Sequence, residues 1–281
     1  MEIKPRDVLT KVIDVPQLVV PDGYVFIAAS TDLNLSYALT TTIVGFKPDM
    51  TAHVITYFFN RCNVDSTLPT AQYNEAIYDL LVALGKQIAS LGLPINGWGI
   101  DGSGLPFDAV TLFAKNSTQL CGIPACACLG RASHIFNPYV RSKLREATNK
   151  TVLCGDAQEH VKAGAGKKYM FWDSDFYRET VQKALLSKVG LAGSLTIFKG
   201  SADEHTEYAI QMTNERLLMV QHKKDGRDIY SWKSREPHDA LDATAQAFAI
   251  AASQGISGQN VGRRIVPRSA LKKVKPRVKI I

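Results

Sequence analysis

The sequence predicts an α/β fold with a mixed central sheet, in which an antiparallel meander is joined by parallel strands and helices flank both faces. Three β-rich stretches with short connections come first, and this arrangement favours antiparallel pairing. Strand and helix patterns then alternate, which is the order that builds parallel pairs. The first strand is also almost continuously apolar, as expected of a strand in the middle of a sheet.

The first strand is predicted over residues 25–30, because Val25 to Ala29 form an unbroken apolar run. The run stops at Ser30, Thr31 and Asp32, which places Asp32 at or just past the end of the strand. A carboxylate there is held by rigid backbone outside the core, where a metal ligand or an acid/base group is well positioned. Asp is also a common turn residue, and this reading stays open.

The remaining elements follow from periodicity and from turn residues. The meander continues with strands at 38–46 and 53–60, and apolar residues at three- and four-residue steps predict a helix over 74–90. Residues 131–166 are expected to form an exposed, loop-rich insertion. The other predicted elements are a strand running into a glycine-rich turn (95–104), a helix starting near Pro106, a buried strand (121–130), a strand (169–172), a helix (176–189), a strand (195–198), a helix (204–213), a hairpin (216–222 and 228–233) around Asp225-Gly226, and an Ala-rich helix (237–253).

Composition indicates an ordinary globular chain of 281 residues, 46% hydrophobic and 21% charged. We expect an N-terminal arm (1–22), one α/β domain (23–255) and a basic C-terminal tail (256–281). No apolar run reaches the roughly 20 residues of a membrane-spanning helix, and the N-terminus lacks a signal-peptide core. The five cysteines are an odd number without a CxxC pair, so we expect reduced thiols in a cytoplasmic protein.

The positive charge is concentrated at the C-terminal end. From residue 261 onward the chain has eight Lys or Arg and no acid, which leaves residues 1–260 at +7 − 8 = −1. Such a tail is typical of an arm for nucleic acid or for an acidic partner, although a solvated end that only aids solubility is also possible. The candidate DNA-binding residues are Arg263, Arg264, Lys272, Lys273 and Lys275.

Four aspartates are the candidate catalytic and metal-binding residues. Asp32 and Asp101 each end a predicted strand, and Asp239 and Asp242 lie on one face at the start of the last helix. Clustered carboxylates repel one another unless a cation lies between them, and oxygen ligands suit Mg²⁺ or Mn²⁺. Two such ions about 4 Å apart could activate water and stabilise the leaving oxygen of a phosphodiester. Each acid also has an ordinary explanation, as a turn residue or a helix-start charge.

Several weaker candidates accompany these acids. His238 could assist proton transfer or orient a carboxylate, but a histidine at a helix start is more often merely exposed. Asp173 and Asp175, at the end of a strand, could be additional or alternative ligands. Lys and Arg in residues 141–168 could contact phosphates without reading sequence. Ser103 lies in DGSG and not in a GxSxG elbow, which argues against serine-hydrolase chemistry.

Over most of residues 20–255 the chain resembles a known family. TDLNLSYALTTTIVGF, GIDGSG with FDAV after it, the Asp-Gly hairpin and HDALDA are similar to the nuclease domain of a tailed-phage terminase large subunit, in its lambda-like branch. That domain belongs to the RNase H-like superfamily. The resemblance implies an RNase H-like mixed sheet and an endonuclease that cuts concatemeric double-stranded viral DNA during packaging, using two Mg²⁺ or Mn²⁺ ions.

Position by position, the resemblance matches Asp32 and Asp101 to the first two metal-binding acids. The third acid falls on HDALDA, where Asp239 and Asp242 both remain candidates. The implied partners are double-stranded DNA, a packaging ATPase motor, a small terminase subunit and the portal, in the host cytoplasm. The basic tail would suit contact with DNA or the portal.

The chain departs from a full large subunit in lacking a GxxxxGK[ST] phosphate loop, since GAGKK at 164–168 has neither the spacing nor the Ser/Thr. We therefore expect an isolated nuclease domain, the product of a split gene, or a relative without the motor. Three rival interpretations are a non-catalytic RNase H-like scaffold that binds DNA or capsid protein, an actin-like or sugar-kinase-like ATPase using the DGSG turn, and a resolvase or transposase of the same fold.

Overall fold

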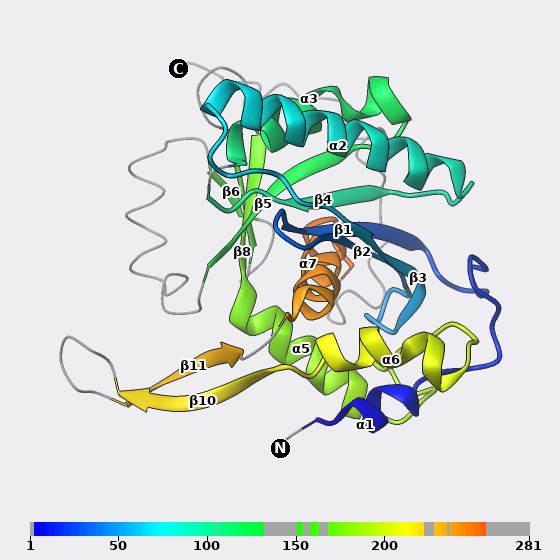
Figure 1. Cartoon of the computed structure of the whole chain (residues 1–281). Helices are drawn as coiled ribbons and strands as arrows, with labels where there is room; N and C mark the ends of the chain where they lie inside the picture. Colours follow the sequence, from blue (N-terminus) through cyan, green and yellow to red (C-terminus); the bar gives the residue numbers. More distant parts are fainter. Residues whose placement is uncertain are drawn as a thin grey trace, which may run out of the picture.

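The computed structural model describes residues 3–256, apart from 105, 132–150, 154–157, 163–167, 222–227 and 235–236. Within this part of the chain, helices cover both faces of a nine-stranded mixed sheet, and a two-stranded ribbon extends from one side (Figure 1). The strands are β1 (Phe26–Asn34), β2 (Ala38–Phe46), β3 (Ala52–Arg61), β4 (Gly97–Asp101), β5 (Ala125–Arg131), β6 (Thr151–Leu153), β7 (Gln158–Lys162), β8 (Lys168–Asp173), β9 (Leu195–Ile197), β10 (Glu215–Gln221) and β11 (Asp228–Ser234). The helices are α1 (Pro5–Leu9), α2 (Thr70–Ser90), α3 (Phe107–Cys121), α5 (Ser174–Leu186), α6 (Ala202–Gln211) and α7 (Asp239–Ser253).

The sheet has the strand order β6-β7-β8-β5-β4-β1-β2-β3-β9. β1, β2 and β3 pair antiparallel as a meander, whereas β1 pairs parallel with β4, β4 with β5 and β5 with β8. The predicted combination of a meander and parallel strands is therefore confirmed. Because β1 and β4 run parallel side by side, the ends of both strands meet at one edge of the sheet.

β1 is buried on both faces because helices cover the two sides of the sheet. Phe26 and Ala28 pack into the core on the side of α5, α6 and α7, and Ile27 and Ala29 pack into the core under α2 and α3. This explains why the sequence of the strand is apolar without alternation. The chain thus has one hydrophobic core on each side of the sheet (Figure 1).

α7 lies close against the sheet because small residues form the contact. Most of its alanines are fully buried, and Gly99 on β4 faces it directly, so that a methyl group at Gly99 would lie 2.9 Å from the side chains of Gln246 and Ile250. Phe248 packs edge-on against Phe46 of β2 with ring centroids 4.9 Å apart. This close packing sets the position of the first turn of α7 relative to β1 and β4.

Three expectations are wrong in detail. β1 continues to Asn34, so Asp32 lies inside the strand, because Ser30 to Asn34 keep pairing with β2 after the apolar run has ended. Cys121 is the last residue of α3 and not part of a strand, since Gly122 ends that helix in the left-handed conformation. The expected loop-rich insertion contains β6 and β7, which extend the sheet beyond β8.

The two ends of the chain were expected to lie outside the domain. α1 falls within the predicted arm and packs against α6, with Val8 fully buried. The predicted basic tail begins at residue 256, and residues 257–281 lie outside the described part of the chain, as does the Asp225-Gly226 turn. The division into arm, domain and tail remains a prediction. Among the helices that the structure describes, none is long and apolar enough to cross a membrane.

Buried His53 gives the fold a defined sensitivity to acid. Its side chain is fully buried on β3, Nδ1 is 2.9 Å from Thr196 Oγ1, and burial lowers the pKa of His53 from 6.5 to about 4. A histidine with a lowered pKa stabilises the fold above its unfolded pKa and loses that contribution as the pH falls towards the folded pKa.

We therefore expect the free energy of unfolding to fall by about 3 kcal/mol more between pH 6.5 and pH 4 in the native chain than in His53→Gln. Urea unfolding at a series of pH values measures this difference. If the free energy of unfolding depends on pH in the same way in the two proteins, the prediction is wrong, because His53 then takes up a proton in the folded state as readily as in the unfolded state.

Candidate active site

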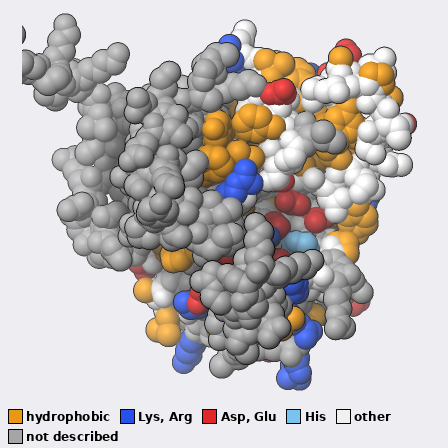
Figure 2. Space-filling view, turned by 90° about the vertical axis from the view of Figure 1, so that its left-hand side faces the viewer, with side chains coloured by type: hydrophobic (Ala, Val, Ile, Leu, Met, Phe, Trp, Pro, Cys, Tyr) orange, Lys and Arg blue, Asp and Glu red, His pale blue; other side chains and the backbone are white. Residues whose placement is uncertain are grey.

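The predicted acids lie at the edge of the sheet where β1 and β4 end. Asp32 is on β1, Asp101 is the last residue of β4, and Asp239 is the first residue of α7. Asp32 and Asp239 line a cleft of about 770 Å³ together with Asn34 and Ser103. Figure 2 shows acidic side chains and a histidine gathered in a hollow of this face. The structure therefore brings together acids that are more than 200 residues apart in the sequence.

The other acids of this region act electrostatically on Asp32. Burial raises the pKa of Asp32 well above its ordinary value, and the negative charges of Asp101, Asp242 and Asp239 raise it further. Burial also raises the pKa of Asp101 and of Asp239, and the negative charge of Asp242 adds to the rise at both positions. Carboxylates that are difficult to ionise in the protein alone are expected where a cation completes the site.

Neighbouring groups hold these acids in place. The Asn34 amide donates to Asp239 Oδ2 at 3.3 Å, and the Ser103 backbone N–H donates to Asp101 Oδ1 at 3.1 Å. Beside Asp32, the Trp98 indole N–H donates to Thr31 Oγ1 at 2.9 Å, and Thr31 is bonded in turn to Thr41 of β2. The end of β1 is therefore fixed by hydrogen bonds to both of its neighbouring strands.

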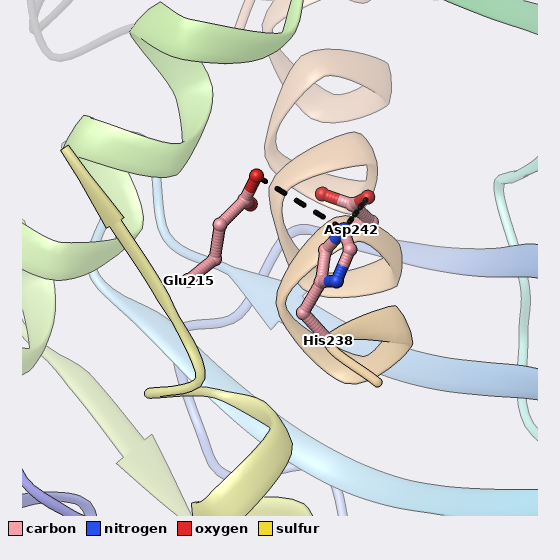
Figure 3. A group of neighbouring side chains, drawn as sticks. All are labelled: Glu215, His238 and Asp242. Carbon is pink, nitrogen blue, oxygen red and sulfur yellow. Dashed lines mark ion pairs between the residues drawn. The ribbon is translucent and has the colours of Figure 1, made fainter. Parts of the chain in front are cut away.

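Asp242 has different surroundings from Asp239. The guanidinium of Arg178, on α5, donates from Nε to Asp242 Oδ1 at 2.6 Å and from Nη2 to Asp242 Oδ2 at 2.9 Å. Arg178 Nε also lies 2.9 Å from Glu215 Oε2 at the start of β10. His238 Nε2 lies 3.5 Å from Asp242 Oδ2 and 4.0 Å from Glu215 Oε1 (Figure 3). Asp242 thus belongs to an ion-pair cluster formed by four side chains.

Residues 2–261 match the protein family described as the terminase large subunit gpA endonuclease domain. The chain belongs to this family. The match covers nearly all of the 281 residues, and it confirms the resemblance to a terminase large subunit nuclease domain. Among curated proteins, no sequence matches the chain.

Three solved structures are similar to this gpA-family domain at low identity. The nuclease domain of the large terminase subunit gp2 of bacterial virus Sf6, a mutant with manganese and beta-thujaplicinol, is 12% identical and has a TM-score of 0.47, with 88% of this chain and 98% of that chain covered. RuvC of Thermus thermophilus is 10% identical with a TM-score of 0.34, covering 82% and 97%. The large terminase of a thermophilic bacteriophage is 12% identical with a TM-score of 0.38, covering 85% and 42%.

Side chains at two places in the gpA-family domain have the chemistry of metal ligands, and at one of them three potential ligand atoms lie close together. Among the residues that the structure describes, Glu215, His238 and Asp242 form a group whose potential ligand atoms all lie within 4.8 Å of one another. Arg178 already supplies a positive charge to that group. Asp32, Asp101 and Asp239 offer carboxylate oxygens alone, which suits a hard divalent cation, and no arginine or lysine hydrogen bond to them is seen within the described residues.

The weaker candidates lie at helix starts and at the cleft. His238 is the residue before α7 and is partly exposed beside Asp242. Asp173 caps α5 by accepting a hydrogen bond from the Phe176 N–H at 3.0 Å, and Asp175 lies in the first turn of that helix. Ser103 is exposed at the rim of the cleft. Most of residues 141–168, and all the candidate residues of the basic tail, lie outside the described part of the chain.

Sequence reasoning missed Arg178 and Glu215. Their side chains are 14% and 7% exposed, and burial raises the pKa of Glu215 to about 7 against the opposing charge of Arg178. Neither residue stands in a recognisable motif, because one lies in the middle of an amphipathic helix and the other begins a hairpin strand. The HxxxD spacing of His238 and Asp242 is the only sequence signal that points to this cluster.

Proposed function

We propose that this domain is a metal-dependent DNA endonuclease that cuts concatemeric double-stranded DNA during viral genome packaging, with Mg²⁺ or Mn²⁺ as cofactor. The observation that supports it best is that buried Asp32 lies beside a cleft with its pKa raised by burial and by the charges of Asp101, Asp242 and Asp239, in a chain of the gpA endonuclease-domain family. Such a group of carboxylates is stable in its ionised form when a cation lies among them.

In this proposal Asp32, Asp101 and Asp239 hold the metal. A bound divalent cation would supply Lewis-acid stabilisation of the phosphodiester and lower the pKa of an attacking water. Asn34 and the Ser103 N–H orient two of the ligands, because each donates a hydrogen bond to one carboxylate. The partly exposed ring of His238 faces both Asp242 and Glu215, with Nε2 3.5 Å and 4.0 Å from their carboxylate oxygens.

The number of ions depends on Asp242 and Glu215. The family resemblance implies two ions, and these two carboxylates are the ligands that remain after Asp32, Asp101 and Asp239. Arg178 pairs with both of them in the structure.

The proposed partners are double-stranded DNA, a packaging ATPase motor, a small terminase subunit and a portal. Contact through Arg263, Arg264, Lys272, Lys273 and Lys275 is proposed from their charge alone.

Nicking and linearisation of a supercoiled plasmid test the proposed activity. We expect the native chain to cut in Mn²⁺ or Mg²⁺ and not in EDTA, and Asp101→Asn to lower the rate by at least about 10²-fold because a metal-binding charge is lost. Asp108→Asn is the matched control, since Asp108 is an exposed acid on α3, seven residues further along the chain.

Cleavage in EDTA, or equal rates for Asp101→Asn and the native chain, would contradict the proposed metal site. Binding of DNA without any cleavage in either metal would favour the scaffold interpretation.

A further inference from the structure

Arg178 is the most tightly held cation in the described part of the site. Two of its nitrogens contact the two oxygens of Asp242, and Nε also lies 2.9 Å from Glu215. The side chains of Arg178, Asp242 and Glu215 are 14%, 18% and 7% exposed. A bidentate guanidinium–carboxylate contact fixes the orientation of the carboxylate as well as its charge.

The charge of Arg178 acts beyond its direct partners. It opposes the rise in the pKa of Asp32, which the charges of Asp101, Asp242 and Asp239 increase. It also interacts with Asp175 in the first turn of α5. Arg178 is therefore a fixed positive charge within a group of acids, and its position comes from α5, whose packing against α7 brings it there.

The two aspartates of HDALDA are held differently. Both oxygens of Asp242 accept from Arg178, whereas Asp239 accepts from a neutral amide, Asn34, at 3.3 Å. A cation that approaches Asp242 must compete with a bound guanidinium, and one that approaches Asp239 meets no such competitor among the contacts seen. The two positions are therefore unequal as metal ligands, although their spacing in the sequence makes them look equivalent.

We propose that Arg178 is a positioning residue that acts as the internal counter-ion of Asp242 and Glu215, so that the resting site takes up one divalent cation, at Asp32, Asp101 and Asp239. Uptake of a second ion at Asp242 and Glu215 then requires Arg178 to withdraw. The counter-ion role stands on the geometry alone, and the count of ions rests on the proposed function.

Thermal unfolding in EDTA tests the counter-ion role. Arg178→Gln leaves two carboxylates without their partner, and we expect its Tm to fall by roughly 10 °C. Arg178→Gln combined with Asp242→Asn removes one charge of each sign and should recover at least half of that loss, because the pair is coupled. Arg178→Lys keeps the charge but not the planar fork, and should lie between the native chain and Arg178→Gln.

An exposed ion pair in the same chain provides the matched control. Arg61 Nη2 lies 2.6 Å from Glu207 Oε1, but these side chains are 50% and 42% exposed. Arg61→Gln should change Tm by less than about 3 °C, since exposed pairs contribute little. An equal effect of the two substitutions, or no recovery in the double variant, would overturn the counter-ion role.

Calorimetric titration with Mn²⁺ tests the count of ions. We expect the native chain to bind one Mn²⁺, Arg178→Gln to bind a second one, and the Arg178→Gln/Asp242→Asn variant to bind one again. Asp239→Asn should weaken the first event by at least about tenfold. If Arg178→Gln does not fold, the Arg178→Gln/Asp242→Asn variant still tests the count of ions. If that variant loses Mn²⁺ binding as completely as Asp239→Asn does, Asp242 is a ligand of the resting site and the proposal is wrong.

Two Mn²⁺ ions bound to the native chain would also overturn the proposal. If the native chain binds no Mn²⁺, the proposed metal site fails, and the counter-ion role is then judged on the thermal data alone. The experiments therefore distinguish a failure of the proposed metal site from a failure of the counter-ion role of Arg178.

Discussion

An Asp32→Asn variant should lose at least about 10³-fold of the metal-dependent cleavage rate and yet unfold at a higher temperature than the native chain in EDTA. The loss follows from the central position of Asp32 in the proposed metal site. The gain follows from its raised pKa, which shows that the ionised carboxylate is disfavoured by burial and by three neighbouring acids. We expect the gain to appear as an increase in Tm of about 2–4 °C.

The gain in stability should depend on pH in a defined direction. A carboxyl group with a raised folded pKa stabilises the fold below its unfolded pKa and loses that contribution as the pH rises through the folded pKa. The difference in Tm between Asp32→Asn and the native chain should therefore be largest near pH 8 and shrink towards pH 4. Added Mn²⁺ should reverse its sign, because only the native chain keeps the full set of ligands.

Asp65 provides the control for this comparison. It lines the same cleft but is exposed, and its hydrogen bonds with Thr67 lower its pKa. Asp65→Asn should therefore not raise Tm in EDTA at pH 8. A lower Tm for Asp32→Asn under those conditions would show that Asp32 is stabilised in its ionised form and would remove the electrostatic argument for the site.

Gly99→Ala should disable the nuclease without touching a catalytic side chain. The added methyl group would lie 2.9 Å from Ile250 Cγ1 and Gln246 Nε2 of α7 and 3.2 Å from Cys128 Sγ. Gln246 can turn its amide aside, but Ile250 must change its side-chain conformation or α7 must move away from β4, and overpacking of this kind costs about 1–3 kcal/mol. Since α7 carries Asp239 and Asp242, a displacement of about 1 Å should lower the cleavage rate by about 10²-fold.

Gly97→Ala is the matched substitution on the same strand. Its methyl group would lie 3.3 Å from Ile250 Cγ2 and 3.7 Å from Phe26 Cζ, so a smaller adjustment is enough. Plasmid cleavage and urea unfolding of both variants separate the two effects. Equal cleavage rates for Gly99→Ala and Gly97→Ala would mean that the position of α7 does not limit activity.

Much of the sheet can be predicted from the sequence, because a strand buried on both faces, such as β1, has apolar residues at successive positions. Ile27 and Ala29 face one core and Phe26 and Ala28 face the other, so the strand had to be apolar throughout. Asp32 was noticed because it follows that run, although pairing with β2 places it inside the strand. The apolar run in the sequence therefore indicates Asp32 as a candidate, whereas its backbone position depends on pairing between β1 and β2.

The distinction between Asp239 and Asp242 could not be read from the sequence. It depends on Arg178, which is 64 residues away from Asp242 along the chain, and on Glu215, which begins a hairpin strand. An arginine in an amphipathic helix is usually solvent-exposed, so its residue type gives no indication of a buried pair. Only the packing of α5 against α7 determines which aspartate receives the guanidinium.

The order of the acids along the chain has a consequence for protein synthesis. Asp32 and Asp101 leave the ribosome early, whereas Asp239 belongs to α7, the last helix in the described part of the chain. A nascent polypeptide that has not yet reached α7 has Asp32 and Asp101 without Asp239, and its sheet lacks the helix that covers β1. Under the proposed function, cutting by this domain therefore begins only after translation has passed residue 253, which protects nearby DNA from incomplete chains.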